Sequence, residues 1–315
     1  MSQINILMYH YVRNIKDSKF PNIKGLEFKN FKNQLNYLQK NFNIIDPQKL
    51  LEYPKSRLPD NSCVLTFDDG YKDHVKYVLP ELKKRKLKGC FFPSGITTFE
   101  NQVLDTNMIQ HIIAKAPSID KLFKEINTLC IEFGESKISI NKKILLYSKN
   151  PKKNSQNPRN RFDKGKVIYI KRLLQFGLSK KTRQFIIKLL FKKYVNVLEN
   201  IFAKDFYLNV DDINKLLDNE MTIGSHTYSH EWLANLSPKE QNIEINQSVD
   251  FLNYFKVSTK KWFICFPYGS YNKNTLSLLK KNNCKIGFTT KSQIANLKKN
   301  NLLELPRKDT NDYPK

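Results

Sequence analysis

Short apolar strands alternate with amphipathic helices along two separate stretches of this chain, and this alternation restricts the fold more than any other feature. In the first hundred residues we expect strands at 4–10, 63–67 and 89–93. Helices are expected between them, at 28–42, where apolar side chains recur every three or four positions, and at 71–86. Strands that alternate with helices in this way are typical of a parallel α/β sheet or barrel.

The same alternation returns after about residue 205. Ser237 and Glu240 form the pattern of a capping box, with Pro238 at the first helical position. The expected strands are 221–224, 262–266 and 285–289, and the expected helices are 210–219, 237–255 and 274–282. We therefore predict one discontinuous α/β domain that is formed by residues 1–99 and 205–315.

Residues 100–204 differ from the rest, because they are expected to contain only helices and polar loops. Within 137–204 there are 19 Lys and Arg against 2 Asp and Glu, whereas the rest of the chain has 35 against 27. The positive charge is therefore localised, and a general bias toward lysine does not explain it. We predict a basic α-helical insertion at 100–204, with two amphipathic helices near 168–174 and 185–197 and a mobile loop at 150–161.

The sequence leaves the role of this basic segment open. Its two helices would suit docking on the anionic face of a membrane or on a diphosphate-linked glycan. They would equally suit a helical hairpin that acts as a lid, with the two helices packed on each other and the lysines in solvent. Nucleic acid is the less favoured partner, because no nucleic-acid-binding motif accompanies the charge.

Composition and cysteine spacing restrict the class of protein further. Apolar residues make up 40% of the 315 residues, which allows a sizeable core and excludes a disordered or low-complexity chain. The five cysteines are odd in number and never form a C-x-x-C pair, which argues against a disulfide framework and a thiolate zinc site. The chain has neither a signal-like start nor a long apolar run that would span a membrane, so we expect a cytoplasmic protein.

Two adjacent carboxylates follow the strand at 63–67, in the stretch Thr66-Phe67-Asp68-Asp69-Gly70. Adjacent residues at a strand end point to opposite sides, so that one carboxylate can bind a cation while the other has a different role. Gly70 permits a sharp turn out of the strand. The alternative is that both aspartates cap the helix that follows.

Two histidines, His226 and His230, form the second candidate site. They stand at positions i and i+4, which would place both on one face of a helix, the spacing at which two imidazoles share one metal. With an aspartate of the first motif they would form an Asp/His/His site with open positions, which suits a catalytic Zn²⁺ or a similar divalent ion. The alternative is a pair of ordinary surface histidines.

Together with Cys265-Phe266-Pro267-Tyr268-Gly269, these two motifs resemble the ordered motifs of the polysaccharide deacetylases of carbohydrate esterase family 4, the NodB-homology family. The resemblance covers about 1–99 and 205–315. It implies a distorted (β/α) barrel of the NodB-homology type, interrupted by the basic insertion. It also implies a hydrolase of carbohydrate metabolism that cleaves the amide bond of N-acetylated sugars.

The resemblance implies roles for single residues. Asp69, His226 and His230 would bind the divalent metal, Zn²⁺ being the first choice, and Asp68 would be the general base. The backbone N–H of Tyr268, which follows Pro267 in the third motif, would hold the oxyanion.

The chain departs from the family pattern in two places. Cys265 stands where the family has an arginine, and no C-terminal Leu-x-His follows. The stretch Leu7-Met8-Tyr9-His10 is instead similar to the permuted arrangement of poly-N-acetylglucosamine deacetylases, which implies that His10 is the catalytic acid. Arg307, in a segment similar to a late family segment, would then replace the missing arginine beside Asp68. A core histidine and a surface or fold-closing arginine are the alternatives.

The resulting expectation is a metal-dependent N-deacetylase that acts on N-acetylated sugars of a surface polysaccharide or of its cytoplasmic, lipid-linked precursor, peripheral to the inner face of the membrane. Two other functions remain open, namely another amide or imide hydrolase on the same fold, or a basic binding module without enzymatic activity. His74, expected in solvent on a helix, and His111 receive no role. Trp232 would either border the sugar-binding groove or pack in the core.

Overall fold

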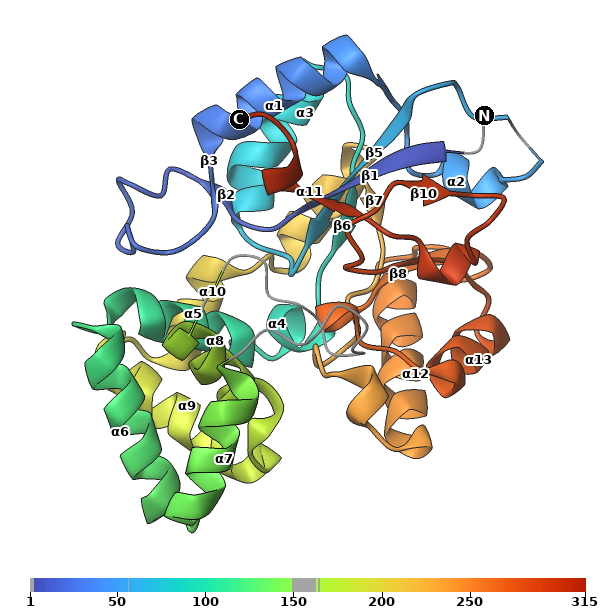
Figure 1. The fold of residues 1–315 in the computed structure, drawn as a ribbon. Coiled ribbons are helices and arrows are strands. Elements are labelled where there is room, and N and C mark those ends of the chain that lie inside the picture. The colour runs from blue at the N-terminus through green and yellow to red at the C-terminus, as the bar shows by residue number, and fades with distance from the viewer. Residues whose placement is uncertain (1–2, 56, 149–162, 164) are drawn as a thin grey trace. The chain divides into compact units, whose positions relative to one another are not determined.

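The computed structural model describes residues 3–55, 57–148, 163 and 165–315, which form two units (Figure 1). The strand unit comprises Met1–Asn14, Gly25–Gln102 and Asn200–Lys315, and the helical unit comprises Ile15–Lys24 and Val103–Glu199. The sequence analysis predicted the insertion at 100–204 and placed residues 15–24 in the α/β domain. In the structure, residues 15–24 belong to the helical unit. The loop predicted at 150–161 lies outside the described residues.

The strand unit contains the elements expected on both sides of the insertion, with shifts of a few residues at their ends. Its strands are β1 (Gln3–Tyr9), β2 (Val12–Arg13), β3 (Leu26–Glu27), β4 (Asn43–Ile44), β5 (Ser62–Asp68), β6 (Cys90–Phe92), β7 (Thr222–Ile223), β8 (Trp262–Cys265), β9 (Cys284–Phe288), β10 (Ala295–Asn296) and β11 (Lys308–Asp309). Its helices are α1 (Phe28–Asn41), α2 (Lys49–Glu52), α3 (Leu79–Lys84), α4 (Gly95–Phe99), α10 (Glu199–Phe206), α11 (Val210–Asp218), α12 (Pro238–Tyr254) and α13 (Lys273–Lys281). Short turns are the π-helical η1 (His74–Val78) and the 3-10 turns η3 (Leu233–Asn235), η4 (Pro267–Gly269), η5 (Leu302–Glu304) and η6 (Thr310–Asp312).

The strands of this unit pair in a circuit. β1, β5, β6 and β7 are parallel neighbours in that order, and the free edge of β1 pairs with β10 and, in parallel, with β11. The circuit continues through two single bridges and one parallel pair. Ser225, just after β7, pairs with Ile264 of β8, β8 pairs in parallel with β9, and Phe288 of β9 pairs with Leu305. Because Leu305 leads into β11, the pairing returns to β1. The result is the distorted (β/α) barrel that was predicted.

Alternate residues of the strands face two separate cores, as the period of two in a strand requires. In β5, Cys63, Leu65 and Phe67 pack with the helices, whereas Val64 packs with a second cluster that also contains Phe263 and Cys265 of β8. Thr66 and Asp68 lie on the same side of β5 as Val64. Asp68 and Cys265 therefore face the same interior, one at the end of each strand.

The helical unit is formed by α5 (Asp105–Lys115), α6 (Ile119–Glu132), α7 (Lys137–Tyr147), α8 (Gly165–Arg172), the π-helical η2 (Leu173–Gly177) and α9 (Lys180–Tyr194). The amphipathic helices predicted near 168–174 and 185–197 correspond to α8 with η2 and to α9. α9 packs against α5 and η2, and α6 packs against α7 and α8. Among the described helices, none combines the length and the apolarity that crossing a bilayer requires.

Candidate active site

Two consecutive carboxylates leave the end of β5 in different directions. Asp68 is the last residue of the strand, and Asp69 and Gly70 follow it in the left-handed region, with φ values of 69° and 66°. A Cβ atom at Gly70 would lie 2.8 Å from Cα of Pro93, so this turn requires glycine. As predicted from the strand end, the two carboxylates have different partners: Asp68 contacts Arg307, and Asp69 contacts two histidines.

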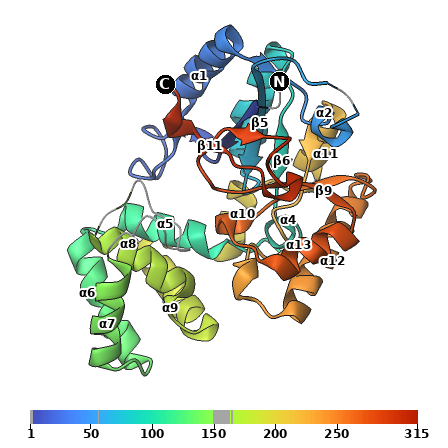
Figure 2. The ribbon, with the colours of Figure 1, turned by 45° about the vertical axis from the view of Figure 1, so that its right-hand side comes forward.

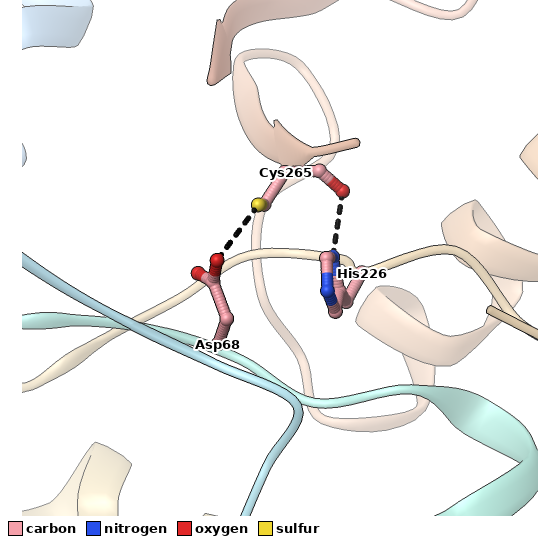
Figure 3. Close-up of side chains that lie close together, drawn as sticks. All are labelled: Asp68, His226 and Cys265. Atoms are coloured by element: carbon pink, nitrogen blue, oxygen red, sulfur yellow. Dashed lines mark hydrogen bonds between the residues drawn. The ribbon is translucent and has the colours of Figure 1, made fainter. Parts of the chain in front are cut away.

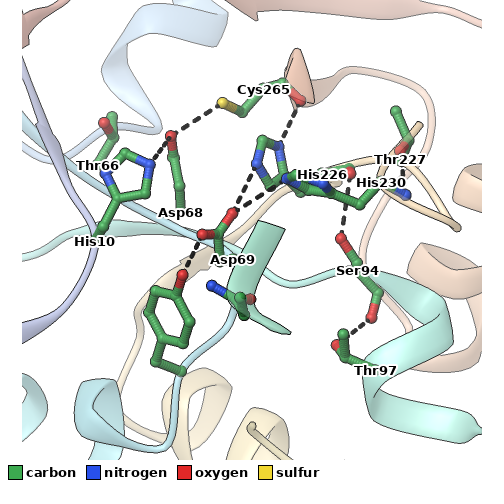
Figure 4. A network of polar contacts seen from close by, with 12 residues as sticks. His10, Thr66, Asp68, Asp69, Ser94, Thr97, His226, Thr227, His230 and Cys265 are labelled. Carbon is green, nitrogen blue, oxygen red and sulfur yellow. Dashed lines mark hydrogen bonds and ion pairs between the residues drawn. The ribbon is translucent and has the colours of Figure 1, made fainter. Parts of the chain in front are cut away.

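Asp69, His226 and His230 converge on one point (Figure 4). The Nε2 atoms of His226 and His230 lie 3.1 Å and 3.3 Å from Oδ1 of Asp69, and all three side chains are buried. The hydroxyl of Tyr71 donates a hydrogen bond to the other oxygen, Oδ2, of Asp69. The sequence prediction gave Tyr71 no role. The one signal for this contact is that Tyr71 follows Asp69 by two residues.

The two histidines do not lie on one face of a helix, and this prediction is wrong. They lie in a loop after β7, in which Thr227 and His230 have left-handed φ values of 60° and 57°. Both rings therefore reach Asp69 without helical geometry. The loop is further fixed because Thr227 Oγ1 accepts a hydrogen bond from the N–H of His230.

A buried carboxylate from another element supports the same loop. Oε2 of Glu244, on α12, accepts hydrogen bonds from the backbone N–H groups of Tyr228 at 3.1 Å and Ser229 at 2.9 Å. Both donors stand between the two histidines. The sequence did contain a signal for Glu244, which the prediction missed. Its position places a charged residue on the buried face of α12, next to Ile245 and Ser248.

The donor set of Asp69, His226 and His230 fits a divalent metal. Their ligand atoms lie within 4.8 Å of one another. Nδ1 of His226 lies 2.8 Å from the backbone carbonyl oxygen of Cys265; as an N–H donor to that oxygen, it leaves Nε2 as the atom with the free electron pair. One carboxylate and two imidazoles with open positions form a set that suits Zn²⁺ and similar ions.

A second group of three ligand-type side chains, Asp68, His226 and Cys265, is also close together within the described part of the chain (Figure 3). It is the weaker candidate for a metal. Both oxygens of Asp68 accept hydrogen bonds from Arg307, and burial raises the pKa of the Cys265 thiol, whereas metals bind the thiolate. Cys265 therefore acts here as a hydrogen-bonding group, with Sγ donating to Oδ2 of Asp68 at 3.3 Å.

Asp68 forms a forked ion pair with Arg307. Nη1 and Nη2 of Arg307 lie 2.8 Å and 2.7 Å from Oδ1 and Oδ2 of Asp68. The fully buried guanidinium also donates to Oγ1 of Thr66, to Sγ of Cys265 and to the carbonyl oxygen of Thr289. The structure thus brings Arg307 to the side of Asp68 where Cys265 stands. The sequence prediction did not identify the contact of Thr66 with Arg307, as it did not identify that of Tyr71 with Asp69.

These contacts determine the charge state of both carboxylates. Burial alone would raise the pKa of Asp68, but the charge and hydrogen bonds of Arg307 outweigh it and lower the pKa to about 2. Burial likewise opposes the ionisation of Asp69, but the imidazoles of His226 and His230 beside it hold its pKa well below the usual value. Both groups are therefore carboxylates near neutral pH.

His10 follows β1 and lies at the rim of the site. Its Nε2 is 3.9 Å from Oδ2 of Asp68, and its side chain is 41% exposed, in contrast to the buried groups around it. The backbone carbonyl oxygen of His10 lies 3.1 Å from Nε2 of His74. His74 was expected in solvent, and this expectation is wrong: it is fully buried between Phe67 and Phe91, because η1 packs inward against β5 and β6.

Tyr268 and Trp232 form an aromatic pair beside His230. Their rings stack with centroids 4.2 Å apart and planes 6° from parallel, and the Tyr268 ring lies 4.9 Å from that of His230. Both are only partly buried. Pro267 begins the turn η4, in which Tyr268 has a left-handed φ of 59°.

His111 lies in the helical unit, buried against Phe20.

Comparison with known proteins gives this geometry a family context. The model of the family described as polysaccharide deacetylase matches residues 55–124 and 177–287, more than half of the chain. A curated relative from Bacillus subtilis (strain 168), "Putative polysaccharide deacetylase YxkH", is 29% identical over 151 residues, which cover 45% of this chain and 51% of that protein. The chain thus matches about half the length of this relative.

Solved structures share the fold at low sequence identity. The chain is similar to Streptococcus pyogenes deacetylase PplD in complex with acetate, with a TM-score of 0.58, 19% identity and coverage of 98% of this chain and 92% of that one. It is similar to IcaB from Ammonifex degensii with the same TM-score and coverages and 14% identity. Both matches extend over nearly the whole chain and agree with the mixed α/β architecture.

Proposed function

Because this chain belongs to the polysaccharide deacetylase family, we propose that it is a divalent-metal-dependent N-deacetylase that releases acetate from N-acetylated sugars of a polysaccharide or its lipid-linked precursor. The family acts as hydrolases on N-acetylated sugars. The observation that carries the proposal for this chain is the convergence of Asp69, His226 and His230 next to the Arg307-bound carboxylate of Asp68. Zn²⁺ is the metal we propose, because one carboxylate and two imidazoles suit it.

Asp69, His226 and His230 would hold the metal, and a divalent ion there would polarise the amide carbonyl and lower the pKa of a water toward about 7. Asp68 accepts the proton of the attacking water. Its low pKa keeps it ionised, and the forked contact with Arg307 fixes the direction of its oxygens. The backbone N–H of Tyr268, in the turn that Pro267 begins, donates to the oxyanion that develops on the carbonyl oxygen.

His10 protonates the leaving amine in this scheme. It is the one exposed histidine beside Asp68, so a bulky sugar amine can approach it from solvent. Beside His230 lies the stacked pair Trp232 and Tyr268, whose flat apolar faces suit the faces of a sugar ring. The products are acetate and a free amino sugar.

The test is acetate release from oligomers of N-acetylglucosamine by the metal-stripped chain, before and after addition of Zn²⁺. We expect activity only with metal, and a loss of roughly 10²-fold or more in kcat for Asp68→Asn at full metal content. Retained turnover in Asp68→Asn would remove the base from this scheme. Hydrolysis of small cyclic imides with no acetate release from any N-acetylated glycan would instead indicate a different carbon–nitrogen hydrolase.

A further inference from the structure

The helical unit exposes most of the large apolar side chains that lie on the described surface. Nine of the fourteen exposed large apolar residues belong to this unit, although it is the smaller of the two. They are Ile131, Phe133, Ile138, Leu145, Leu146, Phe185, Leu189, Val197 and Leu198. Isolated exposed apolar residues are normal in soluble proteins, but a concentration of this kind marks an interaction surface.

One face of α9 combines these apolar side chains with lysines. Lys181, Phe185, Lys188, Leu189 and Lys192 are all exposed, and their spacing of three and four residues places them on the same side of the helix. Phe185 and Leu189 are 52% and 42% exposed. The opposite side of α9 is buried in the helical unit. The outward face is therefore not needed for the packing of the helix.

The apolar part of this face continues onto the end of α6. Phe133, 43% exposed, packs against Phe185 with ring centroids 4.7 Å apart. α6 and α9 pack on each other within the helical unit (Figure 2). We call the surface formed by Phe133, Lys181, Phe185, Lys188, Leu189 and Lys192 the α9 face.

The charge around the α9 face is strongly positive. The described residues of the helical unit include 18 Lys and Arg against 8 Asp and Glu. A second copy of the chain is therefore a poor partner, because it would bring one set of lysines against another. A nucleic acid would pair with the lysines but would leave the aliphatic side chain of Leu189 against phosphate and water.

We propose that the α9 face docks on the anionic surface of a lipid bilayer. The lysines lie at the headgroups, and Phe133, Phe185 and Leu189 enter the boundary between headgroups and acyl chains. A helix with lysines beside aromatic and leucine side chains is the kind of surface that binds in this interfacial position. The enzyme would then work next to substrates that are held at a membrane, without a membrane-spanning segment in the described residues.

The test is co-sedimentation of the full chain with vesicles of phosphatidylcholine alone and of phosphatidylcholine mixed with phosphatidylglycerol, at low and high salt. We expect binding to the anionic vesicles at low salt and its loss at high salt. Lys181→Glu/Lys188→Glu/Lys192→Glu should lower binding more than a hundredfold, since the loss of each lysine near an anionic leaflet costs about fivefold and each added carboxylate is repelled. Phe185→Ser/Leu189→Ser should lower it about tenfold, because two inserted apolar side chains are lost.

Matched controls in the strand unit separate a docked face from general charge and hydrophobicity. Lys273→Glu/Lys280→Glu/Lys281→Glu on α13 and Ile243→Ser/Tyr254→Ser on α12 change exposed residues of the same types, and both should retain binding. Phe185→Trp adds a readout that does not depend on lost binding: its fluorescence should shift to the blue on anionic vesicles. Equal binding to both vesicle types, an equal loss in the control variants, or binding to duplex DNA but not to vesicles would overturn the proposal.

Discussion

Arg307 holds Asp68 through two parallel hydrogen bonds of 2.8 Å and 2.7 Å in a fully buried pair, although 239 residues separate them along the chain. The pair links the end of β5 with the segment that leads into β11. It also fills the place next to Cys265, where the related motif has an arginine. The base of the proposed reaction is therefore positioned from the opposite end of the chain.

Removing this guanidinium should affect both folding and catalysis. Arg307→Ala leaves a buried carboxylate without its partner, which costs about 3–5 kcal/mol in the free energy of unfolding and raises the pKa of Asp68. Arg307→Lys keeps the charge but loses the fork, so its stability and kcat should fall between those of Arg307→Ala and the unaltered chain. Urea unfolding and acetate release measure both. Exposed Arg57→Ala is the control and should change stability by no more than about 0.5 kcal/mol.

The metal assignment predicts a specific loss of metal content. His226→Ala and Asp69→Asn should each lose bound zinc after dialysis, as measured by elemental analysis, because each removes one of three ligand atoms. Glu52→Gln, an exposed acidic residue of the strand unit, should keep the metal. Full metal stoichiometry in His226→Ala would show that the ion binds elsewhere.

Glu244 should influence the metal without touching it. Glu244→Ala leaves the N–H groups of Tyr228 and Ser229 unpaired in a buried place and releases the loop that carries both histidines. We expect zinc affinity to fall about 10–100-fold, the scale for groups that orient ligands, in a competition assay with a fluorescent chelator. Asp250→Asn, exposed on the same helix, is the control. An unchanged affinity in a folded Glu244→Ala would mean that the loop holds itself.

His10→Ala should separate the acid from the metal site. The variant should bind zinc normally and lose about 10²-fold or more in kcat, since a general acid contributes on this scale. The alkaline limb of its pH–rate profile, along which a catalytic acid loses its proton, should disappear. If the limb and the rate remain as in the unaltered chain, water or another group protonates the amine.

The burial of His74 predicts how stability depends on pH. Burial lowers the pKa of its imidazole to about 4, whereas the unfolded chain binds this proton below about pH 6.5. Unfolding therefore takes up a proton between these values, and the free energy of unfolding should fall as the pH drops from 6.5 to 4, by up to about 3 kcal/mol. In His74→Phe this part of the acid sensitivity should be absent. Equal pH dependence in both proteins would contradict the buried, neutral state.

The strands and helices on both sides of the insertion could be predicted because their signals are local. The apolar period of α1 and the capping box of Ser237 and Glu240 act within a few residues, and both are present in the structure. The two histidines show the limit of this reasoning. A spacing of i and i+4 fits a helix, but it also fits a loop with two left-handed residues, and the contacts that support this loop include Glu244 on another element.

The contacts that complete the site were only partly visible in the sequence. Arg307 was considered beside Asp68 only because its segment resembles a family motif, since no local pattern connects residues so far apart. Tyr71 and Thr66 carry no such pattern. The place of Glu244 on the buried side of α12 was a local signal, but it did not indicate that its partners lie in the loop after β7. The assignment of residues 15–24 to the helical unit was missed for the same reason. Local periodicity does not indicate which distant segments pack together.

The return of the strand circuit to β1 has a consequence for synthesis on the ribosome. β1 and β5 emerge early, but β11 and Arg307 follow more than two hundred residues later. At about 5–20 residues per second, roughly 10–50 s pass between the synthesis of Asp68 and of Arg307. During this time the nascent chain has one edge of β1 unpaired and the Asp68 carboxylate without its cation. A chaperone that covers open strand edges would therefore be expected to bind the nascent chain in this interval and to release it once residue 307 is available.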